Sequence, residues 1–466
     1  MTSVFVLTAK FLLALSLAVS CALIVRHERL GNWLKSKSWG FVTWTFILQR
    51  VAAFLMVFVV VKPETVSDMN AYIFQAHSVI QGKRAFIDFE TGYGPWFAWL
   101  ISWPVRAWDS VGAIALVAVM FEFAAWPLWM RLLRNHFGED KAKLAAWVYV
   151  AAPLALMNVP MVGLNQIWIT AFLGAALVMM ESRRDFISGL LMGASVVAVK
   201  FLSLLFAPLM FWVARKKVSW AVGLVLLPVV AYTMLWAQGA DLTGQVKMHA
   251  HYDSSGNLPY LVGLTGIDPS APQARSISNL IGLLGLAGAF FACVGTGRLR
   301  DQRQLLLALP LFLLITLCLS KKSFSHYLEL TMFPLAMLVV LERARLSTVL
   351  GFVVVMVTTC LEPSLWFRWL HQKELSAVVY HRLTGWAPAT ADVVMFIAVE
   401  VLMLGGYLLL GWRLWQWMSP AAPVLSNPIE HEHSRIHLHR AAEAASSEGC
   451  GQCDPAGTVP GAQTAR

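Results

Sequence analysis

Long apolar runs, separated by short polar segments, fill most of the chain. An α-helix needs about 20 apolar residues to cross the hydrocarbon core of a bilayer, and we see none of the alternating segments of about 10 residues that form transmembrane strands. The pattern therefore predicts an all-α polytopic integral membrane protein. We expect roughly thirteen transmembrane helices near residues 4–25, 41–61, 110–130, 144–162, 166–180, 186–199, 202–214, 219–237, 279–297, 304–319, 327–341, 347–362 and 392–412.

The polar segments between these runs predict the orientation of the chain. Basic clusters occur at 26–37, 131–143, 182–185, 215–217, 298–303 and 343–345. Cytoplasmic loops carry an excess of Lys and Arg, so we expect these clusters inside and the N-terminus outside. The predicted outside segments are then 62–109, the turn at Asn165 and Gln166, 238–278, 320–326 and 363–391. The stretch 95–108 is apolar but short, and it is expected to be an interfacial or re-entrant helix.

Composition supports a membrane protein. Only 13% of residues are charged, about half the share in an average soluble domain. The net charge of +10 is explained by the basic clusters between runs, so no nucleic-acid partner is expected. The segment 419–466 is rich in Pro, Ala, Ser, Gly and His, which is typical of a disordered extension.

The first outside loop contains the acidic residues of greatest interest, in "SDMNAYIFQAHSVIQGKRAFIDFETGYGPW" (67–96). Asp68 directly follows a predicted span, so its carboxylate should lie at the membrane interface, where it can act as a general base on a hydroxyl group. Asp88 and Glu90 lie further along the same loop, among aromatic residues that include Tyr72 and Tyr93. The simpler interpretation is a charged, solvated loop.

Lysines form a second unusual feature. Lys321 and Lys322 lie on the predicted outside, against the general trend, and Lys200 interrupts two short apolar halves. His326 and Tyr327 begin the next run at the same interface. Cationic groups can stabilise the anion that forms when a phosphate leaves. The alternative is that these lysines merely extend toward acidic lipid headgroups.

These stretches, in this order, resemble the GT-C superfamily of membrane glycosyltransferases that use polyprenyl-phosphate sugars. The closest similarity is to bacterial mannosyltransferases of the glycosyltransferase family 87 type. The matching segments are the loop 67–96, the "GLLMGASVVAVKF" run with Lys200, and "SHY" followed by Pro334. In the first loop the matching positions are Asp68, Tyr72, Gly82, Phe86, Asp88, Phe89, Tyr93 and Pro95.

The resemblance implies a function and a role for each residue. Asp68 would be the catalytic base, and the donor phosphate would be bound by Lys200, Lys321, Lys322, His326 and Tyr327. The substrate-binding residues would be Tyr72, Asp88, Glu90, Tyr93 and Asn257. The reaction would be an inverting transfer of a sugar, mannose in the nearest relatives, to a lipid, glycan or protein acceptor. It would take place at the outer face of the cell membrane, the inner membrane of a bacterium.

The predicted organisation has four parts. Residues 1–39 would form an additional span and a basic loop, 40–345 a GT-C-like catalytic core, 346–418 the C-terminal spans, and 419–466 the tail.

Metal binding has only weak support in the sequence. His249, His251 and Asp253 alternate in an outside loop, and the tail holds His431, His433, His437, His439 and a single "CGQC". A zinc signature needs two ligand pairs at defined spacing, so no metal site is predicted and no cofactor is certain. A divalent cation remains possible.

Two other functions are compatible with the pattern. A flippase or transporter of lipid-linked glycans is one, and ionisable residues within spans, such as Glu122 and Glu400, would suit it. However, no internal repeat typical of transporters is evident. A polymerase or ligase of lipid-linked glycans shares the same lipid-phosphate chemistry.

Overall fold

The computed structural model describes residues 4–61, 68–243, 254–263, 272–370 and 391–419. The chain divides after Pro420, and the fold is that of the first unit. Its described residues form helices, with one isolated β-bridge and no strand. The helices are α1 (Val4–Arg26), α2 (Glu28–Ser36), α3 (Trp39–Phe54), the π-helix η1 (Leu55–Val61), α4 (Asp68–Ile80), α5 (Phe97–Ala107), α6 (Val111–Phe137), α7 (Glu139–Ala151), α8 (Pro153–Leu156), the π-helix η2 (Met157–Val162), α9 (Gln166–Glu181), α10 (Asp185–Ala198), the 3₁₀-helix η3 (Phe201–Phe206), α11 (Ala207–Val213), α12 (Lys217–Ala237), α14 (Leu258–Gly263), α15 (Pro272–Gly295), α16 (Gln302–Leu319), the 3₁₀-helix η4 (Ser325–Thr331), α17 (Met332–Leu341), α18 (Leu346–Leu370) and α20 (Ala391–Trp417).

Eight of the described helical stretches are long and apolar enough to cross a membrane, which confirms a multi-pass membrane protein. A ninth arises if α7 is counted with α8 and η2, which are bent by 52° at Ala152. The expected thirteen crossings are therefore not all present as full-length helices, although a helix lies at each expected position. Four apolar stretches are shorter, of 10–17 residues. At 1.5 Å per residue, the 16 residues of α9 extend about 24 Å, less than the hydrocarbon thickness of about 30 Å.

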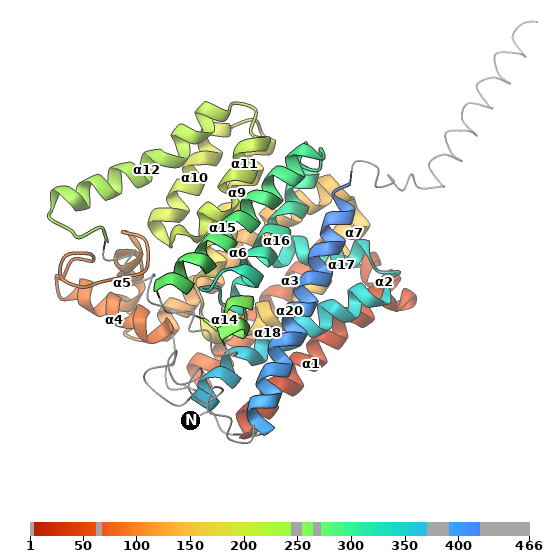
Figure 1. The fold of residues 1–466 in the computed structure, drawn as a ribbon. Helices are drawn as coiled ribbons and strands as arrows, with labels where there is room; N and C mark the ends of the chain where they lie inside the picture. Colours follow the sequence, from red (N-terminus) through yellow and green to blue (C-terminus); the bar gives the residue numbers. More distant parts are fainter. Residues whose placement is uncertain (1–3, 62–67, 244–253, 264–271, 371–390, 420–466) are drawn as a thin grey trace, which may run out of the picture. The chain divides into compact units, whose positions relative to one another are not determined.

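The segment predicted as interfacial forms α5, an 11-residue helix with Pro104 inside it. It packs against α4, and the two short helices lie together at one side of the helical bundle (Figure 1). An 11-residue helix is too short to span a bilayer.

The basic clusters gather at one end of the helices. Hydrogen bonds and ion pairs connect the loops to one another: Arg26 to the carbonyl groups of Arg343 and Ala344, Lys143 to the Lys35 carbonyl, Arg131 to Glu181, and the Lys216 amide to Asp185. Because α10 and α16 both begin at this end, their last residues, next to Lys200 and Lys322, lie at the opposite end. The structure thus separates the basic loops from the segments around Lys200 and Lys322.

Close backbone contact holds α10 against α12. A Cβ atom added to Gly189 would lie 2.9 Å from the Leu224 nitrogen, and one added to Gly223 would lie 2.9 Å from the Leu190 nitrogen. Small residues allow helices to approach closely in a membrane, where no hydrophobic effect drives them together. The glycines of the "GLLMGASVVAVKF" run therefore fix the position of the helix that precedes Lys200.

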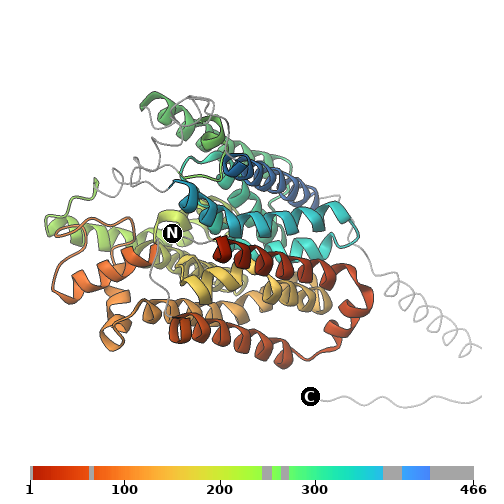
Figure 2. The ribbon, with the colours of Figure 1, turned by 90° about the horizontal axis from the view of Figure 1, so that it is seen from below.

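Helix α20 packs against α18, and α18 packs against α1. Figure 2 shows them one below the other, in dark blue, teal and dark red. Deeper in the bundle, Tyr149 and Phe333 stack with their ring centroids 3.9 Å apart. The same region holds a buried ion pair, in which the Arg50 Nε donates to Glu122 at 2.9 Å. The Tyr149 hydroxyl donates to the same carboxylate at 2.8 Å.

Candidate active site

Asp68 is the first residue of α4, and α4 is anchored by polar contacts further along. His77 lies 2.6 Å from the Asp109 carboxylate, and the Thr91 hydroxyl donates to the Gln75 side chain at 2.8 Å. The first contact ties α4 to the segment before α6, and the second ties it to the loop that follows α4. The half-buried Asp68 is thus presented at the start of a well-held helix.

The loop after α4 is joined to the end of α10 by backbone hydrogen bonds. The Gly94 amide donates to the Val199 carbonyl at 2.7 Å, and the Trp96 amide donates to the Val197 carbonyl at 2.9 Å. A Cβ atom at position 94 would lie 2.5 Å from the Val196 oxygen, so only glycine fits. This pairing fixes Tyr93 beside the residue that follows Val199.

Lys200 follows Val199 and adopts an extended conformation between α10 and η3. Its ammonium group lies over two aromatic rings, 4.6 Å from the centroid of Tyr327 and 5.7 Å from that of Tyr93. Cations are attracted to the faces of such rings. Asp68 is close enough to interact electrostatically with Lys200, Tyr93 and Tyr327, so a carboxylate and an ammonium group share one site.

The turn between α16 and η4 brings further positive charge to the same place. Lys322 interacts electrostatically with Lys200, Lys321 and Asp68. Burial, together with the two neighbouring lysines, lowers the pKa of Lys322 to about 8. The side chain of Lys321 is buried.

Two aromatic residues complete the group. The His326 ring stacks on Phe324 at 5.3 Å between centroids, and His326 also lies within electrostatic range of Lys200. Tyr72 packs edge-on against Tyr93, with centroids 5.2 Å apart, and interacts with Asp68. We refer to Asp68, Tyr72, Tyr93, Lys200, Lys321, Lys322, His326 and Tyr327 as the Asp68–Lys200 cluster.

The cluster combines groups suited to three tasks. A half-buried carboxylate can accept a proton from a hydroxyl group. Three lysines can bind an anion such as a phosphate. Aromatic rings can pack against an apolar or sugar face. Eight of the eleven residues predicted from the sequence therefore meet at one end of the bundle.

Asp88 and Glu90 lie apart from these groups. Asp88 closes a local turn, in which it accepts a hydrogen bond from the Arg84 amide at 2.7 Å and pairs with the Arg84 side chain at 3.4 Å. The Arg84 amide, followed by its side chain and Lys83, lowers the pKa of Asp88. Glu90 is exposed. The turn satisfies Asp88 locally, and nothing in this geometry brings either carboxylate to Asp68.

Asn257 stabilises the chain entry into α14. Its side-chain nitrogen donates to the Ser254 carbonyl at 2.7 Å, and its side-chain oxygen accepts from the Tyr260 amide at 2.9 Å. The residue is fully buried. Both ends of the amide are therefore engaged within the protein.

Several buried ionisable residues were not selected from the sequence. Glu329 follows His326 on η4, is 1% exposed, and has no hydrogen-bond partner for either carboxyl oxygen. Glu362 is also buried, as is Arg50, the partner of Glu122. Their common sequence signal is a lone charged residue inside an apolar run, which membrane proteins seldom tolerate without a reason.

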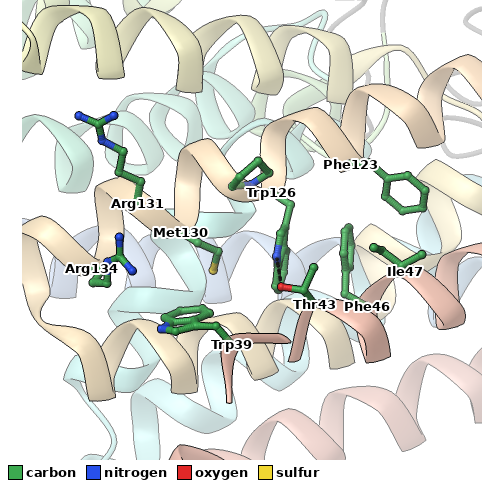
Figure 3. A pocket seen from close by; sticks show the side chains of 10 residues that line it. Trp39, Thr43, Phe46, Ile47, Phe123, Trp126, Met130, Arg131 and Arg134 are labelled. Carbon is green, nitrogen blue, oxygen red and sulfur yellow. Dashed lines mark hydrogen bonds between the residues drawn. The ribbon is translucent and has the colours of Figure 1, made fainter. Parts of the chain in front are cut away.

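A cavity of about 400 Å³ opens between α3 and α6. Figure 3 shows its lining, in which the Trp126 indole donates to the Thr43 hydroxyl at 3.1 Å. Arg131 and Arg134 line the cavity too, and they pair with Glu181 and Glu139. Since these arginines belong to a basic cluster, the cavity lies toward the end remote from Asp68.

Within the described ranges, no group of three or more His, Cys, Asp or Glu side chains is arranged to hold a metal. His249, His251 and Asp253 lie outside the described residues, as do the histidines and the Cys450 and Cys453 pair of the tail. Comparison of the chain with protein-family models, with curated proteins and with solved structures finds no match.

Proposed function

We propose that this protein is an inverting glycosyltransferase that uses a polyprenyl-phosphate-linked sugar, with Asp68 as its catalytic base. The sugar we expect is mannose, and the acceptor is a hydroxyl group of a lipid, glycan or protein. The reaction takes place at the extracytoplasmic face of the cell membrane. The single observation that carries the proposal is that Asp68 lies within electrostatic range of Lys200 and Lys322, with Lys321 beside Lys322, at the end of the bundle opposite the basic loops.

The proposed reaction has one chemical step. Asp68 takes the proton of the acceptor hydroxyl as its oxygen attacks the anomeric carbon of the donor sugar. The bond between that carbon and the phosphate oxygen breaks, and the polyprenyl phosphate leaves with the bonding electron pair. Attack from the opposite side inverts the anomeric configuration, by the same geometry that inverting glycosidases use with water.

The lysines supply what a phosphate leaving group requires. The departing phosphate gains negative charge, and fixed positive charges lower the free energy of that transition state. Lys200 is held by the rings of Tyr93 and Tyr327, so its ammonium group is positioned before the donor arrives. Lys322 and Lys321 approach the same region from the turn before η4.

A transfer assay in proteoliposomes tests the proposal. Wild-type protein and Asp68→Asn are supplied with radiolabelled polyprenyl-phosphate mannose and a membrane extract as acceptor. Removing a general base typically costs about 10²–10⁴-fold in rate, so we expect a loss of this size in Asp68→Asn.

Asp88→Asn is the matched control, because it removes a carboxylate from the same loop. Asp88 is exposed and contacts Arg84, so this variant should keep most of its activity. Equal transfer by wild-type protein and Asp68→Asn would refute the role of Asp68. Loss in both variants would point to a general effect of loop charge.

A flippase or transporter for lipid-linked glycans is the second candidate. The observation that favours it is the buried set of Arg50, Glu122 and Glu329, because transporters often place ionisable residues within the membrane. The same proteoliposomes separate the two functions. A transporter would move the labelled lipid to the other leaflet without forming a new glycosidic bond.

A further inference from the structure

Two buried carboxylates that are not members of the Asp68–Lys200 cluster lie near each other. Glu362 is on α18 and Glu400 is on α20, and these helices pack along one another. The two side chains interact electrostatically. Glu362 is 3% exposed and Glu400 is 0% exposed, so water does not screen their charges.

Neutral oxygen atoms surround Glu362. The Ser325 hydroxyl donates to one carboxyl oxygen at 2.7 Å, and the Ser255 hydroxyl donates to the other. The backbone of Gly256, which has a φ of +83°, passes so closely that an added Cβ would lie 3.9 Å from the Glu362 carboxyl carbon. The helices α18 and α20, the 3₁₀-helix η4 and the segment before α14 therefore contribute to one oxygen-rich site.

Glu400 provides a second, independent observation. Both of its carboxyl oxygens are buried and have no hydrogen-bond partner. Glu362 and the backbone of Gly256 both act electrostatically on this carboxyl group. No basic side chain in the described ranges forms an ion pair with either glutamate. Burying two unpaired carboxylates is very costly unless a cation or a proton neutralises them.

We propose that Glu362 and Glu400 bind a divalent cation of the Ca²⁺ type, with the hydroxyl groups of Ser255 and Ser325 as neighbouring oxygen donors. Two carboxylates match a charge of +2. Among the described residues, the groups that contact the pair offer oxygen atoms, which favours a hard cation over zinc. Ca²⁺ accepts hydroxyl, carbonyl and water oxygens in irregular geometry, which suits a site with only two carboxylates.

The cation would fasten an outer segment to the membrane helices. Ser255 precedes α14, whereas Ser325 begins η4, the helix that carries His326 and Tyr327. The neighbouring Ser254 already connects the two segments, since its hydroxyl donates to the Ser323 carbonyl at 2.8 Å. Binding would therefore stabilise the packing of η4 against α18 and α20.

Thermal unfolding tests the site without any reliance on glycosyl transfer. Purified full-length protein is stripped with EDTA, and its apparent Tm is followed by tryptophan fluorescence as CaCl₂ is added to about 10 mM, above the range of about 10⁻⁴–10⁻³ M typical of extracellular sites. Wild-type protein should show a saturable rise in Tm. MgCl₂ should give a smaller rise, and KCl of equal ionic strength should give none.

Glu400→Gln and Glu362→Gln should each abolish the Ca²⁺-dependent rise. Glu329→Gln is the matched control, because Glu329 is equally buried and also has no hydrogen-bond partner, and it should keep the rise. A wild-type Tm that does not respond to divalent cations would overturn the proposal, as would a full response in Glu400→Gln. A Tm that responds only to acidification would mean that a shared proton neutralises the pair.

Discussion

Replacing Gly94 with alanine should both destabilise the protein and disturb the cluster. The new Cβ would lie 2.5 Å from the Val196 oxygen and 2.6 Å from the Val197 carbonyl carbon. Ordinary contacts begin near 3.4 Å, and the Val197 oxygen is closer still to the added Cβ, so the loop and the end of α10 must separate by more than about 0.9 Å. Neither contact is with a flexible side chain, so the backbone itself must move.

The size of the effect follows from two contributions. Overpacking of this kind costs about 1–3 kcal/mol. The separation also weakens the hydrogen bonds that Gly94 and Trp96 donate to Val199 and Val197, each of which contributes about 0.5–1.5 kcal/mol. We therefore expect a loss of about 2–6 kcal/mol if both bonds break. Tyr93 should also move away from Lys200, which would weaken donor binding.

The assay is the apparent Tm at a fixed heating rate, with Gly288→Ala as the control. Gly288 lies within α15 and has no atom within 4 Å of an added Cβ, so alanine there should raise stability by up to about 1 kcal/mol. A Tm for Gly94→Ala equal to that of the wild type would refute the close pairing of the loop with α10.

Two further predictions concern buried charge. The pKa of Lys322 lies near 8 in the folded protein, below its usual value of 10.5. Between about pH 8 and 10.5 Lys322 is therefore deprotonated in the folded state but still protonated in the unfolded state, so stability rises with pH in this range. In contrast, kcat/KM for the anionic donor should fall as the pH rises through about 8, because Lys322 loses its positive charge. Because burial also lowers the pKa of Lys200 to about 8, Lys322→Arg should move only part of this fall to higher pH, and an unchanged profile in Lys322→Gln would exclude Lys322 as a source. Arg50→Met should destabilise by about 3–5 kcal/mol, because it leaves Glu122 buried without its partner. The double variant Arg50→Met, Glu122→Leu should recover much of that loss in a thermal unfolding measurement, and a double variant as unstable as the single one would contradict this explanation.

The sequence could predict the site residues that are isolated charges in an apolar chain. In an apolar chain, Asp68, Lys200 and Lys322 stand out because a charge near a membrane needs a partner or a function. The sequence predicts Asp88 and Glu90 as substrate-binding residues because they lie in the same loop as Asp68. Asp88 lies elsewhere because Arg84, four residues earlier, closes a turn around it, and such local geometry depends on backbone hydrogen bonds that the residue pattern does not specify.

Long-range partners could not be predicted in the same way. Arg50 and Glu122 are 72 residues apart, and Ser255 and Glu362 are 107 residues apart, so only the folded arrangement of helices brings them together. The number of crossings has a similar cause. Apolar character predicts where helices lie, but the length of each helix depends on where turns such as Arg183–Arg184 begin.

The account depends most on which side of the membrane Asp68 occupies. Asp68→Cys and Lys141→Cys are made in protein whose two tail cysteines are replaced by serine, since the four cysteines in the described ranges are buried. Intact cells are then treated with a membrane-impermeant maleimide. We predict that position 68 is labelled in intact cells, and that position 141, which is exposed in a basic loop, is labelled only after permeabilisation. Labelling of position 68 only after permeabilisation would contradict the proposed orientation and, with it, transfer at the outer face.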